Sequence, residues 1–194
     1  MKALLGALLL ALGLVAPAPG ASAQGVYPTR YDADIRRAAA RWWPAGPDWV
    51  WWRAQLWQES RFRPDAVSPV GAAGLAQFMP GTWADVTRQL RLPPGASPHQ
   101  DVAIDAGAYY MARLMAGWRT ERPQVERLKL AQASYNAGAG HIVKAQTLCG
   151  GARDWVDISP CLPRVTGRHA RETQDYVRLI EDHRRRMILA GARP

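Results

Sequence analysis

Residues 56–83 read Leu-Trp-Gln-Glu-Ser-Arg-Phe-Arg-Pro-Asp-Ala-Val-Ser-Pro-Val-Gly-Ala-Ala-Gly-Leu-Ala-Gln-Phe-Met-Pro-Gly-Thr-Trp, and they decide how the rest of the chain is interpreted. One carboxylate, Glu59, ends a strongly apolar segment. A loop rich in proline, glycine and serine follows, and it leads into a short amphipathic piece that carries Gln77 and Met79. This order predicts an acidic side chain at the end of an apolar helix, faced by a loop of polar and soft side chains.

The segment before Glu59 carries the signals of a buried helix. Asp48 follows a proline and can cap the helix start. The residues after it are apolar nearly all round, which is typical of a buried helix. Trp52, Leu56 and Glu59 stand at i, i+4 and i+7, so Glu59 lies on an apolar stripe. Burial raises the pKa of a carboxyl group, which can then hold a proton near neutral pH and donate it. The spacing alone leaves open that Glu59 is the solvated last residue of a core helix.

The beginning of the 194-residue chain indicates export. Residues 1–23 have the pattern of a secretory signal peptide, with Lys2, an apolar run over residues 3–15, and Ala21-Ser22-Ala23 as the cleavage site. The apolar run is short for a membrane span, so we expect no transmembrane anchor in the mature form. The formal net charge of +9 favours acidic partners. In an exported protein the carboxylates of cell-wall peptide stems fit this charge better than nucleic acid does, although ordinary solubility also explains it.

The cysteines and histidines indicate a structural crosslink and no metal. Cys149 and Cys161 are the two cysteines of the chain and bracket an irregular stretch, which predicts a disulfide in an oxidising compartment. The four histidines are scattered, without the Cys/His spacing of a metal site. We therefore expect no metal and no cofactor.

Hydrophobic periodicity predicts a mainly α-helical protein. Besides the helix that ends at Glu59, helices are expected at residues 31–43, from 80 or 82 to 90, at 101–118, at 123–136 and from about 168 to 187. Residues 24–30 are expected to form a flexible lead-in, residues 60–74 a loop, and residues 146–167 an irregular segment.

Three separate motifs resemble one known family. The first is made of Glu59-Ser60, Ser68-Pro69-Val70-Gly71-Ala72, Gly74-Leu75-Ala76-Gln77 and Pro80-Gly81-Thr82. The second is the Tyr-Asn-Ala-Gly run at residues 135–138, and the third is Glu-Thr-Gln-Asp-Tyr-Val at residues 172–177. In order and spacing they resemble the soluble lytic transglycosylases, which have a goose-type lysozyme-like fold. The chain departs from the family pattern at Ala76, where Met is usual, and at Ala103, where Asn is frequent.

The resemblance implies a fold and a division of the chain. The expected fold is a mainly α, lysozyme-like single domain with a substrate cleft. The expected parts are a signal peptide (1–23), an N-terminal lead-in and first helix (24–40), a lytic transglycosylase SLT domain (41–187) and a C-terminal tail (188–194). The protein is expected to act as a monomer in the periplasm.

The resemblance also implies a reaction and its residues. The substrate would be the glycan strands of peptidoglycan, cleaved at the β-1,4 bond from N-acetylmuramic acid to N-acetylglucosamine without water, so that a 1,6-anhydro end forms. Glu59 would act first as acid and then as base, because the family has no second catalytic carboxylate. The residues expected to bind the sugars and orient Glu59 are Ser60, Ser68, Gln77, Met79, Tyr135, Asn136 and Tyr176. Without the resemblance, Tyr135 would be interpreted as a core residue.

Two other functions fit the same sequence. A hydrolytic muramidase on this fold would use Asp65 or another carboxylate to position water. A non-catalytic cell-wall-binding or secretion-apparatus scaffold is the other candidate, although the intact Glu59-Ser60 pair argues against it. Within the transglycosylase interpretation, the sequence does not distinguish wall recycling from partnership with an envelope-spanning secretion or pilus apparatus.

Overall fold

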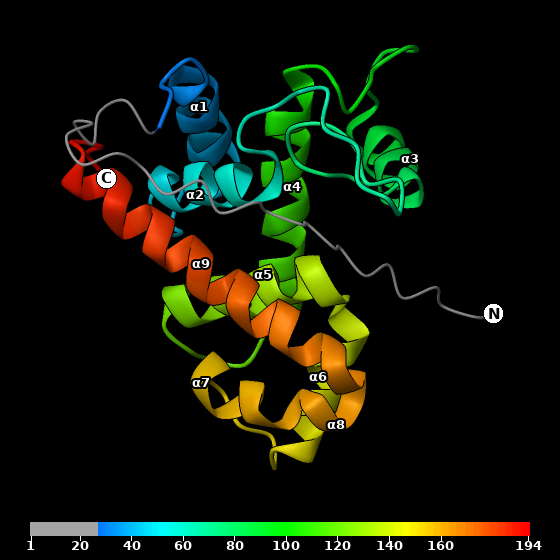
Figure 1. Cartoon of the computed structure of the whole chain (residues 1–194), viewed down its shortest axis with the longest axis vertical. Helices are drawn as coiled ribbons and strands as arrows, with labels where there is room; N and C mark the ends of the chain where they lie inside the picture. The colour runs from blue at the N-terminus through cyan, green and yellow to red at the C-terminus, as the bar shows by residue number, and fades with distance from the viewer. Residues whose placement is uncertain (1–26) are drawn as a thin grey trace.

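The structure is a computed structural model that describes residues 27–194, and within this range the regular secondary structure is helical (Figure 1). The predicted signal peptide, residues 1–23, lies outside the described residues. Extended pairing in the described range is limited to two isolated β-bridges, Val67–Ala73 and Ala73–Phe78. The prediction of a mainly α protein is therefore confirmed.

All six predicted helices are present. They are α1 (Asp32–Trp42), α2 (Trp49–Ser60), α3 (Pro80–Leu90), α4 (Val102–Gly117), α5 (Gln124–Ala137) and α9 (Ala170–Leu189). A further helix, α6 (Ala139–Leu148), was missed. Gly138, with a φ of 88°, ends α5, and the chain resumes helical geometry at the very next residue. A break signal predicts where a helix stops and does not predict how soon the next one begins.

The prediction that residues 146–167 are irregular is wrong in part. Its first residues finish α6, and it then holds α7 (Trp155–Ile158), the 3-10 turn η2 (Ser159–Cys161) and α8 (Pro163–Thr166); the 3-10 turn η3 (Gly167–His169) follows. Each piece has four residues or fewer, which is too short to produce a hydrophobic period that a sequence can reveal. Glycines before the pieces and prolines within them, Pro160 in η2 and Pro163 in α8, are typical of irregular structure and conceal this order.

Helix α2 is almost entirely buried, with ten of its twelve residues buried. It packs against α1 and, most extensively, against α9, which runs diagonally past α2 and α5 in Figure 1. Trp52 is fully buried and its indole Nε1 donates to the backbone oxygen of Ile104, on α4, at 3.1 Å. Gly107 makes this close packing possible, because a Cβ there would lie 2.6 Å from the Trp52 ring. The aromatic run that predicted a buried helix thus fills the core between α2 and α4.

Both ends of α2 are fixed. Asp48 is the N-cap, as predicted, and its carboxylate accepts a hydrogen bond from the backbone N–H of Val50 at 3.0 Å. The same carboxylate pairs with Arg184 of α9 at 2.5 Å. At the other end, Arg61 and Phe62 take left-handed backbone angles, with φ of 55° and 57°. Two such non-glycine residues in succession turn the chain sharply directly after Glu59.

The first described residues are packed rather than free, so the expected flexible lead-in is wrong for them. Tyr27 is buried, and its ring meets the edge of Trp57 with centroids 5.1 Å apart. The buried guanidinium of Arg53, on α2, donates to the backbone oxygens of Tyr27 and Pro28 at 3.2 and 3.3 Å and pairs with Asp32 at 2.7 Å. An arginine inside the apolar helix therefore holds this segment, a contact that hydrophobic periodicity cannot predict.

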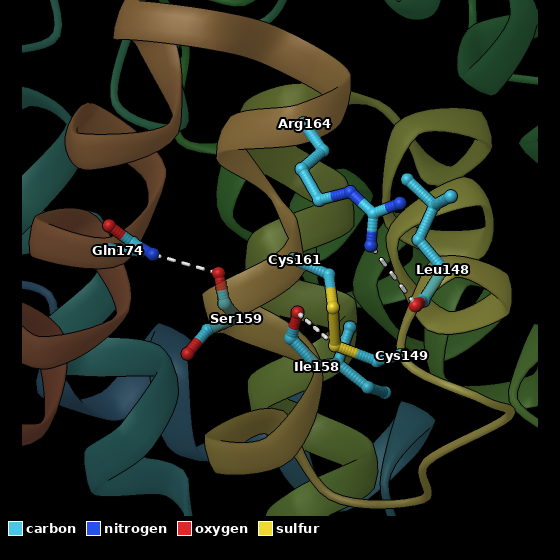
Figure 2. The surroundings of a disulfide bond; sticks show 7 residues. All are labelled: Leu148, Cys149, Ile158, Ser159, Cys161, Arg164 and Gln174. Carbon is cyan, nitrogen blue, oxygen red and sulfur yellow. Dashed lines mark hydrogen bonds between the residues drawn. A yellow bond between two sulfur atoms is a disulfide. The ribbon is translucent and has the colours of Figure 1, made fainter.

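Figure 2 shows the disulfide between Cys149 and Cys161, whose Cα atoms are 5.8 Å apart. The bond joins the residue after α6 to η2. Hydrogen bonds flank it, from Gln174 of α9 to the backbone oxygen of Ser159 at 2.8 Å and from Arg164 to that of Leu148 at 3.5 Å. These bonds tie the short helical pieces to the longer helices on both sides.

Candidate active site

Glu59 is the penultimate residue of α2, and only 5% of its surface is exposed. The hydroxyl of Tyr176, on α9, donates a hydrogen bond to Oε1 of this carboxyl group. Burial raises the pKa of Glu59 from 4.5 to about 8, and the bond from Tyr176 opposes part of the rise. The carbonyl groups at the C-terminal end of α2 also disfavour a negative charge there. Glu59 is therefore not the solvated last residue of a core helix.

Tyr135 lies in the last turn of α5, and its hydroxyl donates to the backbone oxygen of Ala76 at 2.6 Å. Burial and then the negative charge of Glu59 raise the pKa of this phenol well above 10. Its ring also tilts against that of Tyr110, with centroids 5.3 Å apart. Tyr135 thus lies within electrostatic reach of Glu59, while its hydroxyl is used to hold the loop that follows α2.

Ser60 and Gln77 also hold that loop. The buried hydroxyl of Ser60 donates to the backbone oxygen of Leu75 at 2.9 Å. Gln77 has a φ of 45°, and its side-chain Nε2 donates to the backbone oxygens of Ala66 and Gly74 at 3.1 and 3.0 Å. Both side chains satisfy buried carbonyl groups of a segment that has no regular secondary structure to satisfy them.

Ser68 and Met79 are the more accessible of the predicted residues in the loop. Ser68 is partly buried, and its hydroxyl accepts a hydrogen bond from the backbone N–H of Ala72 at 2.9 Å. Met79 precedes α3 and is 40% exposed, which is unusual for so large an apolar side chain.

Asn136 is partly exposed, and its Oδ1 accepts a hydrogen bond from the hydroxyl of Thr173, on α9, at 2.7 Å. Thr173 and Tyr176 are three residues apart on α9 and therefore share a face of it. The sequence interpretation missed Thr173 as a site residue. Its place in the Glu-Thr-x-x-Tyr-Val motif is the signal that could have found it, because the two side chains reach Asn136 and Glu59 from one helix.

A glycine sets the position of the loop. Gly74 has a φ of +76°, and a Cβ on it would lie 1.7 Å from the backbone oxygen of Pro98. His99, next in the chain, has its Nδ1 2.7 Å from the backbone oxygen of Pro64. The segment around residues 98–99 therefore supports the loop at two points, and only glycine allows the closer one.

Gln55 is the second residue that the sequence interpretation missed. It is fully buried on α2, one turn before Glu59, and its Nε2 donates to Sδ of Met111, on α4, at 3.4 Å. Its amide also opposes part of the rise that burial causes in the pKa of Tyr176. An amide inside an otherwise apolar helix is the signal that could have found it.

Residues 27–194 contain no group of three or more His, Cys, Asp or Glu side chains that could hold a metal ion. None of the helices in the same range is both long enough and apolar enough to cross a membrane.

Solved structures define the class of this fold. The chain superposes on the 70 kDa soluble lytic transglycosylase of Escherichia coli with a TM-score of 0.68 and 24% identity, over 87% of this chain and 26% of that one. An inactive mutant of the lytic transglycosylase Slt from Pseudomonas aeruginosa gives a TM-score of 0.65 and 26% identity, over 85% and 24% of the two chains. The fold is therefore the lysozyme-like fold of lytic transglycosylases.

The sequence comparison identifies the family. The model of the Transglycosylase SLT domain matches residues 48–158, more than half of the chain, and the chain belongs to this family. It is 35% identical over 123 residues to the membrane-bound lytic murein transglycosylase F of Serratia proteamaculans, a match that covers 61% of this chain and 24% of that protein. The chain thus spans about a quarter of this curated relative.

Proposed function

We propose that this protein is a peptidoglycan lytic transglycosylase that acts in the cell envelope and in which Glu59 is both acid and base. The observation that carries the proposal is a buried carboxyl group whose pKa is raised to about 8 and whose Oε1 is held by Tyr176. Relatives and structural neighbours named as lytic transglycosylases support it. Export through residues 1–23, a periplasmic location, a monomeric state and the domain limits stay predictions, and so does a secretion or pilus apparatus as partner.

The raised pKa suits the first half of the reaction. At neutral pH Glu59 holds a proton, and it passes this proton to the glycosidic oxygen as the bond from C1 of the muramic acid breaks. Because Tyr176 occupies Oε1, we assign the transfer to Oε2. The substrate's own N-acetyl group assists at C1, so that no second carboxylate is required.

In the second half of the reaction, Glu59 regains a proton. Glu59, now ionised, removes the proton of the sugar's 6-hydroxyl as that oxygen attacks C1, which closes the 1,6-anhydro ring and restores the protonated acid. No water is consumed. Tyr176 supports this half as well, because a hydrogen bond donated to a carboxylate stabilises its ionised form.

The remaining predicted site residues form two groups that differ in their exposure to solvent. We assign contacts with the sugars to the accessible Ser68, Met79 and Asn136. We assign the buried Ser60 and Gln77 to holding the loop, and Tyr135 to fixing the carbonyl group of Ala76.

The test is digestion of purified wall sacculi followed by mass analysis of the products. Wild-type protein should release products that are lighter by one water than hydrolysis products. Glu59→Gln should lower turnover by at least ~10²–10⁴-fold, because Gln cannot donate or accept the proton, while binding to sacculi is retained. Products with reducing ends would show a hydrolytic muramidase instead. Binding without turnover by the wild-type protein would favour the scaffold.

A further inference from the structure

Asn136 and Thr173 meet where α5 packs against α9. The hydroxyl of Thr173 donates to Oδ1 of Asn136 at 2.7 Å, which is the usual length of a hydrogen bond between two oxygens. Thr173 is only 2% exposed, whereas Asn136 is partly exposed and is the penultimate residue of α5. One partner of this pair is therefore fixed inside the protein, and the other reaches its surface.

The direction of this hydrogen bond is unusual for a residue inside a helix. A Thr or Ser hydroxyl in a helix commonly donates to the carbonyl group four residues earlier. Ser134, Thr147 and Thr166 do so, at 2.7, 3.1 and 3.3 Å. The hydroxyl of Thr173 donates to a side chain on another helix instead, so its hydrogen bond restrains Asn136 and does not bond the backbone of α9.

This bond decides which end of the Asn136 amide is free. Oδ1 accepts the proton of Thr173, so the N–H groups on Nδ2 point away from that contact. Nδ2 has no hydrogen-bond partner among residues 27–194, and it is not one of their buried unpaired side-chain atoms, so solvent reaches it. In the opposite orientation Nδ2 would donate to Thr173 and Oδ1 would face the solvent. The hydroxyl would then need a carbonyl group of α9, and within the described range it makes no such bond.

The free end of this amide lies near the carboxyl group of Glu59. Thr173 and Tyr176 are three residues apart on one face of α9, a rise of about 4.5 Å along the helix axis. Thr173 bonds to Asn136, and Tyr176 bonds to Oε1 of Glu59. A glycan strand bound at Glu59 therefore passes within reach of Nδ2 of Asn136.

We propose that Thr173 is a positioning residue that holds the Asn136 amide with Nδ2 toward the glycan, where Nδ2 donates to the carbonyl oxygen of an N-acetyl group. The identity of the ligand rests on the proposed function, whereas the orientation of the amide does not. The carbonyl oxygen of an N-acetyl group accepts hydrogen bonds and has no proton to donate. A sugar with a free amine offers donors in its place. A fixed N–H donor thus selects sugars that keep their acetyl groups.

The experiment compares the binding of two β-1,4-linked glucosamine tetramers, one fully N-acetylated and one without acetyl groups, by isothermal titration calorimetry. The parent protein and all variants carry Glu59→Gln, so that neither ligand is cleaved. The selectivity is the ratio of the two dissociation constants. The substitutions compared below are uncharged, so repulsion between the amines and the basic protein is common to them and cancels when their ratios are compared.

Thr173→Val keeps the shape of the side chain and removes its hydroxyl. We expect it to weaken binding of the acetylated tetramer by roughly 3–10-fold, as loss of one oriented hydrogen bond does, and to lower the selectivity by the same factor. Thr173→Ser retains the hydroxyl and should retain both the affinity and the selectivity. In an Asn136→Ala background Thr173→Val should change neither, because the hydroxyl acts only through the amide.

Ser134→Ala is the matched control. Ser134 is equally buried, lies on α5 two residues before Asn136, and donates to the carbonyl group of Leu130 in its own helix. Loss of this hydroxyl should leave the selectivity unchanged. Thr173→Ala repeats the test if Thr173→Val does not fold.

The outcomes separate the role of Thr173 from the proposed function. Unchanged selectivity in Thr173→Val, or an equal loss with and without Asn136, would overturn that role, whatever the enzyme does to sacculi. So would a parent protein that binds neither tetramer or prefers the one without acetyl groups. A loss of selectivity that depends on Asn136, in a protein that does not cleave sacculi when Glu59 is intact, would support the role of Thr173 and overturn the proposed function.

Discussion

Two segments of similar length lie outside the long helices of this protein, and they are held in different ways. The site loop, residues 61–79, follows Glu59 and is fixed by hydrogen bonds from Ser60, Gln77 and Tyr135 to its backbone. The crosslinked segment, residues 149–169, folds into short helical pieces and is closed by a disulfide. The first is held by side-chain hydrogen bonds without a crosslink, whereas the second adds a covalent crosslink to hydrogen bonds such as those from Gln174 to Ser159 and from Trp155 to Glu126.

The difference follows from what each segment must do. Residues around a reacting carboxyl group have to be placed to within fractions of an ångström, and hydrogen bonds to backbone carbonyls together with left-handed turns give that precision. A segment without a reacting group needs only to stay folded, for which a crosslink that restricts the unfolded chain is sufficient. Changes in the site loop should therefore alter activity and stability together, whereas changes in the crosslinked segment should alter stability alone.

The largest effect should come from pH, through Glu59. In the folded protein its pKa is about 8, against 4.5 for an ordinary Glu, so the folded state holds a proton that the unfolded state loses as pH rises between these values. The free energy of unfolding should fall over that range, by as much as ~5 kcal/mol, relative to Glu59→Gln, which has no such proton. Denaturant unfolding of both proteins from pH 4 to 9 measures the difference. Parallel curves would show that Glu59 titrates normally.

Gly74→Ala should have the next largest effect. The new Cβ would overlap the backbone oxygen of Pro98 and sit on a left-handed φ, at a cost of roughly 3–4 kcal/mol, and turnover should fall as the loop shifts. Gly71→Ala is the control: its φ is +85°, but nothing lies within 4 Å of the added atom. The control should lose only about 1–2 kcal/mol. Equal losses in thermal unfolding would contradict the role given to Pro98.

Removal of the disulfide should separate stability from activity. Cys149→Ser with Cys161→Ser opens a closed loop with a sequence separation of 12 and should cost about 3 kcal/mol. Turnover per folded molecule, measured well below the melting temperature, should stay the same. A proportional loss of turnover would show that the crosslinked segment also positions the site, and the contrast between the two segments would then be wrong.

Asp65→Asn should have the smallest effect, although Asp65 lies in the site loop. Its side chain is exposed, and surface substitutions of this kind usually change stability by less than ~0.5 kcal/mol. Turnover on sacculi should change by less than about threefold, which corresponds to a similarly small change in the activation free energy. Inactivity as complete as that of Glu59→Gln, with products that carry reducing ends, would assign a hydrolytic mechanism with Asp65 as a second carboxylate.

The sequence by itself determined the long helices and the apolar face of α2 that carries Glu59, and it left the burial of that residue open. These are local properties: Asp48 caps its own helix, and Trp52 and Leu56 mark the face that carries Glu59. The motifs also located Tyr135, Asn136 and Tyr176, though only through their resemblance to a family. The sequence did not predict the short helices, because a piece as short as α7 or α8 has no hydrophobic period to detect.

Only the tertiary structure decided what the polar side chains do. Ser60 and Gln77 bind backbone oxygens of the site loop, and nothing in their spacing predicts those partners. The hydrogen bond from Tyr176 to Glu59 joins residues that are 117 positions apart in the chain. Hydrogen-bond partners and the burial that raises the pKa of a carboxyl group depend on which helices meet, so they become defined only when α9 packs against α2.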